Sequence, residues 1–140
     1  MSQGIAEEHV SVSRISDLLN TTFMDHTVDG DGDIHVTDGV EFPCWIAIAQ
    51  RAKLIELFSY FPPEQPTPSH WLTRVNEFNR TIMVPQFSFQ QDAVWGRYWM
   101  TFDGGLDMRQ FIKMLRRFSG AVSIAAGGGL PEATHDANAP

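Results

Sequence analysis

Two apolar segments in the middle of the chain constrain the fold more than any other feature. Residues 42–50 alternate between two sets of side chains, as a β-strand does. Residues 54–61 are apolar on both faces, which is typical of a strand at the centre of a sheet. The segment 62–66 contains three prolines and ends this strand, because proline cannot donate a hydrogen bond to a sheet. The chain therefore contains a β-sheet with at least one central strand.

The remaining patterns place helices around this sheet. Apolar residues at helical spacing predict a helix over 11–22, a second helix from Thr67 and Pro68, and a third opening at Asp107. Further strands are predicted over 24–28, 33–37, 82–90 and 93–102. Pro85 indicates that the third of these is an edge strand or begins only after the proline. The fold class is α+β: an antiparallel β-sheet with helices packed on it, in the order α-β-β-β-β-α-β-β-α.

The turn at residues 29–33 fixes the register of the first hairpin. Val28 and Ile34 are expected on the core face, and alternation then requires an odd-numbered loop of three or five residues. His26 and His35 consequently point to opposite faces.

Length and composition limit the number of domains, the kind of partner and the cellular location that can be expected. A chain of 140 residues fits one domain, and the patterns divide it into a flexible N-terminus (1–10), a single domain (11–122) and a flexible tail (123–140). The net charge of −7 argues against nucleic-acid binding, and the basic cluster at 113–117 is expected at a helix end, where cations are favoured. No apolar run is long enough to span a membrane. A lone cysteine and the absence of a signal peptide indicate a cytoplasmic protein.

No residue pattern predicts a catalytic, cofactor or metal site. Aspartates at 29, 31 and 33 match the first half of an EF-hand loop, but the positions that need glycine and glutamate hold Ile34 and Val40. An acidic hairpin turn is therefore expected. Cys44 lies at an inward position on its strand, where burial raises the pKa of a thiol and leaves it inert. We expect no metal, no cofactor and no enzymatic activity.

Tryptophan is more frequent than a chain of this size requires, with four residues. Trp95, Arg97 and Trp99 alternate and so share one strand face, which is either a partner surface or a face covered by a helix. Because the opposite face of this strand is also apolar, the sheet needs two covers, and one of them could be a second subunit. Asn76 and Asn79 share a helix face and could bond to a neighbouring strand or subunit, or simply be exposed.

The motifs from residue 75 onward resemble a known family. The run Val-Asn-Glu-Phe-Asn-Arg at 75–80, a hairpin, and then Asp-Gly-Gly-Leu at 103–106 before a final helix are similar to the YbjN family of bacterial sensory transduction regulators. The family often has a lysine where this hairpin begins, whereas this chain has Val-Pro-Gln at 84–86. The resemblance implies a fold like that of type III secretion chaperones, a homodimer, and a regulatory or chaperone-like role without catalysis.

Together these observations predict a cytoplasmic, homodimeric protein-binding module whose protein partner is unknown. The expected partner or dimer surface consists of the second helix and the second strand of the hairpin, through Trp71, Val75, Asn76, Asn79, Trp95, Arg97 and Trp99. The alternative is a small-molecule or ion-binding sensor, using an apolar pocket beside the sheet or the 29–33 turn.

Overall fold

A computed structural model describes residues 4–62, 68–81 and 84–127 of the chain. It contains three α-helices, α1 (Val12–Thr21), α2 (Pro68–Thr81) and α3 (Met108–Ala126), and a 3-10 turn, η1 (Glu7–His9), within these residues. The strands are β1 (Gly4–Ile5), β2 (His26–Val28), β3 (Ile34–Val36), β4 (Cys44–Ala49), β5 (Leu54–Phe61), β6 (Gln86–Gln90), β7 (Ala93–Thr101) and β8 (Leu106–Asp107). The predicted α+β class and order are confirmed, with β1, η1 and β8 added.

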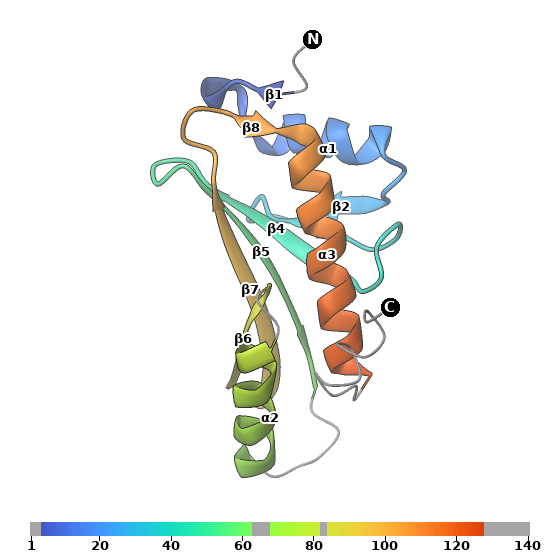
Figure 1. Cartoon of the computed structure of the whole chain (residues 1–140). Helices are drawn as coiled ribbons and strands as arrows, with labels where there is room; N and C mark the ends of the chain where they lie inside the picture. Colours follow the sequence, from blue (N-terminus) through green and yellow to red (C-terminus); the bar gives the residue numbers. More distant parts are fainter. Residues whose placement is uncertain (1–3, 63–67, 82–83, 128–140) are drawn as a thin grey trace, which may run out of the picture.

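Six of the strands form one antiparallel sheet, in the order β2-β3-β4-β5-β7-β6 (Figure 1). β5 lies at the centre between β4 and β7, as its apolar sequence predicts, and β6 lies at the edge. β6 begins at Gln86, immediately after Pro85, so both alternatives that the proline left open are observed. The short strands β1 and β8 pair separately.

The hairpin of β2 and β3 has the predicted register. Val28 pairs with Ile34 across a five-residue loop, and His26 pairs with Val36. His35 therefore points away from the face that carries Ile34 and Val36, both fully buried. The argument from alternation alone is confirmed.

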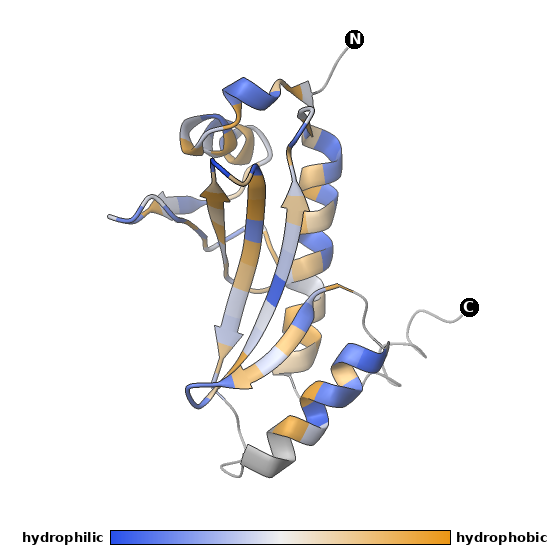
Figure 2. Ribbon diagram, turned by 90° about the vertical axis from the view of Figure 1, so that its left-hand side faces the viewer, coloured by the Kyte–Doolittle hydropathy of each residue, from blue (hydrophilic) through white to orange (hydrophobic). Residues whose placement is uncertain are grey.

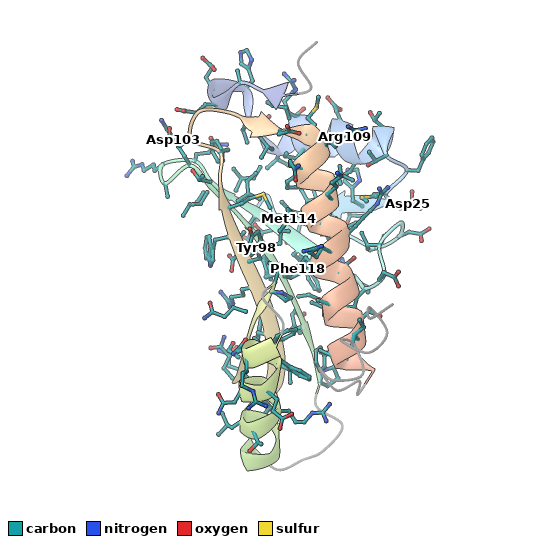
Figure 3. All side chains as sticks on the ribbon, viewed as in Figure 1. Asp25, Tyr98, Asp103, Arg109, Met114 and Phe118 are labelled. Carbon is teal, nitrogen blue, oxygen red and sulfur yellow. The ribbon has the colours of Figure 1, made fainter. Side chains whose placement is uncertain are left out.

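One face of the sheet is covered by α1 and α3, and the hydrophobic core lies between these layers. The core face of β5 contributes Ile55, Leu57 and Phe61, all buried, and α3 contributes Phe111, Leu115 and Phe118. Figure 3 shows Phe118 on α3. Both helices begin where the sequence predicts: Ser11 accepts a hydrogen bond from the amide of Arg14, and Asp107 from that of Gln110.

The second helix, α2, lies along the outer edge of β6 instead of across the sheet (Figure 1). Val75 and Phe78 are its buried residues in the described part, and the ring of Phe78 lies 5.1 Å from that of Phe87 on β6. Thr67, its predicted N-cap, lies outside the described residues. Because α2 packs sideways, it leaves the second face of the sheet without a helix.

The described elements extend beyond the predicted domain limits at both ends. Strand β1 and turn η1 fall within residues 1–10, and α3 continues to Ala126, past residue 122. Glu7 forms an ion pair with Lys53 and accepts a hydrogen bond from the amide of Gly104 at 2.8 Å. Lys53 is the larger cause of the lowered pKa of Glu7, about 2. These contacts tie residues 4–9 to the domain, whereas the sequence pattern had placed them outside it.

Candidate functional site

The second face of the sheet has no helix over it in the described part of the chain. In Figure 2 the long strands lie in front of α3, and their near side is open. The side chains on this side come from alternate positions of β3, β4, β5 and β7, because β7 pairs in register with β5. We call the following set the aromatic face: His35, Trp45, Phe58, Tyr60, Trp95, Arg97 and Trp99.

The rings of the aromatic face form a continuous ladder across the strands. His35 stacks on Trp45 with centroids 4.1 Å apart and planes within 1°. Trp45 in turn lies 5.1 Å from Tyr60, and Tyr60 lies 4.6 Å from Trp95. Aromatic pairs at these separations stabilise each other by about 0.5–1.5 kcal/mol beyond simple burial. The ladder is therefore a rigid surface and not a loose collection of side chains.

Charged side chains lie at the end of this ladder on β7. The guanidinium carbon of Arg97 lies 5.1 Å from the centroid of the Trp95 ring, and its Nη1 donates to Glu56 at 3.1 Å. Burial raises the pKa of Glu56, and the nearby Arg97 opposes this rise. The face thus combines aromatic surface with one half-exposed cation.

Several polar atoms of the aromatic face are unsatisfied. The ring nitrogens His35 Nε2 and Trp95 Nε1 and the guanidinium Arg97 Nε are buried and have no hydrogen-bond partner in the described structure. Each unpaired buried group costs roughly 1–3 kcal/mol, and folded domains usually pair such groups. Three of them on one face indicate a surface not optimised for the stability of the isolated chain alone.

The structure places the β7 tryptophans on the side of the sheet that no helix covers in the described part of the chain. Trp95, Arg97 and Trp99 lie on the open face, and Trp99 is 49% exposed. The opposite side of β7 faces the core. Val94 is fully buried there, and a Cβ added to Gly96 would lie 3.1 Å from the Pro85 side chain and 3.3 Å from the Val122 side chain. The open face is therefore the one with the tryptophans.

The sequence argument missed part of the face. Phe58 and Tyr60 belong to the strand predicted as apolar on both faces, which does not distinguish the covered face from the open one, and Tyr60 is 42% exposed. Their alternation with Leu57, Ser59 and Phe61 was the available signal, since it puts Phe58 and Tyr60 on the face opposite to the buried positions of β5.

The α2 residues expected at the partner surface differ in exposure. Val75 is 6% exposed and packs in the core, so the expectation that it contributes to a surface was wrong. Asn76 is exposed. Trp71 lies in α2, but its side chain is outside the described structure.

Asn79 has a specific structural partner on the edge strand. Its carboxamide nitrogen donates to the carbonyl oxygen of Phe87 at 2.8 Å, and its carboxamide oxygen accepts from the Phe87 amide at 2.6 Å. An edge strand otherwise presents unpaired backbone groups to other chains. Asn79 thus bonds across to a neighbouring strand, one of the alternatives that the sequence left open.

A groove of about 580 Å³ lies between α1 and α3, away from the aromatic face. Ile5, Leu18, Met108 and Ile112 supply its apolar surface. Its charged residues are Arg14, Asp17, Arg109, Lys113 and Arg116. Figure 3 shows Arg109 at the start of α3. The basic cluster expected at a helix end lies well inside α3, which ends at Ala126, so that interpretation was wrong.

The other candidate positions have structural partners. The carboxylate of Asp29 accepts hydrogen bonds from the amides of Asp31 and Asp33, at 2.9 and 3.0 Å, as in an ordinary Asx turn. No group of three or more His, Cys, Asp or Glu residues converges on a metal position among the described residues. Cys44 is fully buried, and burial raises the pKa of its thiol to about 12.

Comparison with known proteins identifies the class. Residues 9–126 match the family model TY-Chap1, described as T3SS (YopN, CesT) and YbjN peptide-binding chaperone 1. The chain therefore belongs to this family of peptide-binding chaperones, and the resemblance to YbjN proteins is confirmed. A comparison with curated protein sequences gives no match.

Solved structures agree on the fold. The crystal structure of YbjN from E. coli is similar with a TM-score of 0.69 and 13% identity, covering 95% of this chain and 96% of that one. A chain of the HopA1–SchA chaperone–effector complex has a TM-score of 0.58 and 11% identity, covering 83% and 91%. The chaperone-like fold is thus shown. In the described part of the chain, no helix is both long and apolar enough to cross a bilayer.

Proposed function

We propose that this protein is a non-enzymatic peptide-binding module of chaperone-like or regulatory type that acts in the cytoplasm as a homodimer. The observation that carries the proposal is the uncovered aromatic face. Its ordered ring ladder and partly exposed Tyr60 and Trp99 offer apolar contact area at little cost in side-chain entropy.

The chemistry of the face favours a peptide over a reaction. Tryptophan, tyrosine and arginine are the side chains that contribute most to binding energy at protein interfaces. The fold is shared with a protein found in a chaperone–effector complex, which supports a segment of another protein as the ligand. The single cysteine is buried with a raised pKa, which disfavours a thiolate nucleophile.

The homodimer is supported by the position of α2. This helix lies at the sheet edge, and Leu72 on it is 53% exposed, so an apolar side chain is available to a second copy. Multi-angle light scattering on the full chain at micromolar concentration should give twice the mass of 15.7 kDa. A monomer under these conditions would refute the dimer but leave peptide binding open.

The peptide proposal is tested with ligands selected on the protein itself. Peptides selected by phage display on the full chain should bind the Trp99→Ala and Tyr60→Ala variants at least tenfold more weakly, the loss typical of truncating an interface hot spot. Phe23→Ala is the matched control, because Phe23 is an aromatic residue that is 88% exposed and lies outside the face. Equal affinity for all three variants would place the peptide elsewhere.

The alternative is a small-molecule or ion-binding sensor. The groove between α1 and α3 favours it, since its volume of about 580 Å³ is within the range of ligand sites. Thermal-shift measurements with calcium and a metabolite panel test this alternative. A shift with calcium would have to displace the amides that Asp29 now binds.

A further inference from the structure

We infer that the groove between α1 and α3 is a second binding site, which takes an acidic amphipathic helix from a protein partner. The inference rests on the proposed function in assuming a peptide ligand, but it concerns a different surface. The groove is lined from both helices and has no residue in common with the aromatic face.

The first support is the distribution of charge. Four of the ten Lys and Arg residues of the chain line this groove, but of the 17 Asp and Glu residues only Asp17 does so in the described structure. A chain with a net charge of −7 has thus gathered positive charge at one place. Such a local concentration is complementary to an anionic partner and would steer its approach.

The second support is that these cations have no ion-pair partner in the described part of the chain. No ion pair within 4.0 Å involves Arg14, Arg109, Lys113 or Arg116 among the described residues. Arg109 is in the first turn of α3, where the helix dipole disfavours a cation, and this turn has no acidic residue. Lys113 is four residues from Arg109, a spacing at which like charges repel. The cluster therefore costs stability, and an anionic ligand would reverse this cost.

The apolar surface and the spacing identify the kind of anion. Ile5, Leu18, Met108 and Ile112 require an apolar contact, which a phosphate or a polar metabolite lacks. Along α3 the cations recur at positions 109, 113 and 116, so they span roughly 10 Å at 1.5 Å per residue. A helix with acidic residues at the same four-and-three spacing presents its carboxylates over the same length, with an apolar stripe beside them.

The probe is a synthetic peptide of about 18 residues, long enough to form a helix. Its glutamates are spaced four and then three residues apart, beside a stripe of leucines. We expect the peptide to bind the full chain with an affinity that falls as the salt concentration increases, because salt screens the exposed ion pairs between its glutamates and the cations of the groove. Arg116→Glu should weaken it about three- to tenfold, from the modest energy of exposed pairs and the reversal of sign. Arg117→Glu should leave it unchanged, since Arg117 is next in sequence and exposed but does not line the groove.

The outcomes separate this inference from the proposed function. Equal weakening by Arg116→Glu and Arg117→Glu, or equal binding of a peptide with lysine for glutamate, would overturn the groove as an acidic-helix site. So would a loss of dimer mass caused by Arg116→Glu alone, which would assign the groove to a second copy. If phage-selected peptides still require Trp99 while the acidic peptide does not bind, the inference fails and the aromatic face stands. Circular dichroism and urea titration confirm that each variant is folded.

Discussion

Replacing Asn79 by alanine removes the two hydrogen bonds that attach α2 to the edge strand β6. Both bonds go to the backbone of Phe87, a residue only 3% exposed, so water cannot fully replace the lost partner. At about 0.5–1.5 kcal/mol for each bond, the loss is roughly 1–3 kcal/mol. Alanine is the better helix former by about 0.7 kcal/mol, so the net destabilisation should be about 0.3–2.3 kcal/mol.

Asn76→Ala is the matched control for this prediction. Asn76 is on the same helix three residues earlier, is exposed, and has no side-chain hydrogen bond in the described structure. It should gain the same helix propensity and lose nothing. The difference between the two variants therefore isolates the contacts to Phe87 and should be about 1–3 kcal/mol.

Urea unfolding followed by tryptophan fluorescence gives both free energies, with an unchanged slope if only stability differs. Amide hydrogen exchange supplies an independent readout, since the Phe87 amide loses its acceptor and should exchange faster in the Asn79→Ala variant. Two variants that agree within about 0.5 kcal/mol, with unchanged exchange at Phe87, would refute the assigned role of Asn79.

Three other predictions follow from single positions. The Cys44 thiol, with its pKa raised to about 12, should react with a thiol reagent at neutral pH only at the rate of unfolding, and rapidly in denaturant. Glu7→Gln should lower the thermal midpoint at pH 7. Because the pKa of Glu7 in the folded chain is about 2, the difference in midpoint between the original chain and the variant should disappear as the pH falls from 4.5 toward 2. Gly39→Ala should cost at least about 2 kcal/mol in urea titration, because φ is +83° and a Cβ would lie 2.8 Å from the Phe23 carbonyl oxygen, whereas Gly30→Ala meets nothing within 4 Å.

The sequence was most informative where a local rule has one solution. Alternation of core residues at Val28 and Ile34 required an odd loop of three or five residues, and the structure has the five-residue loop. Asp107 had both the residue type and the position of an N-cap, and it accepts the Gln110 amide. Pro85 indicated an edge strand or a strand that begins after the proline, and β6 is both.

Features that depend on contacts distant in sequence were not predictable. The position of Val75 in the apolar stripe of α2 is the same whether the stripe packs on the sheet of its own chain or on a second chain. Only the packing of α2 against β6 shows that Val75 belongs to the core. The groove combines Arg14 of α1 with Arg109 and Lys113 of α3, which are nearly one hundred residues apart along the chain. A residue pattern within one helix holds no information on which helix will lie beside it.

The two faces of the sheet differ in the type of apolar side chain that they carry. A hydropathy scale does not distinguish these types. The covered side of β4, β5 and β7 is mainly aliphatic, with Ile46, Leu57 and Val94 fully buried, although Phe61 and Tyr98 also lie on it. The other side is largely aromatic. Its histidine and tryptophan rings carry polar nitrogen atoms, and the cation Arg97 lies among them. Aliphatic side chains gain nothing at a boundary with water, whereas tryptophan and tyrosine have an apolar body with a polar group that water or a partner can satisfy. In these strands the tryptophans therefore lie on the face that no helix covers in the described part of the chain.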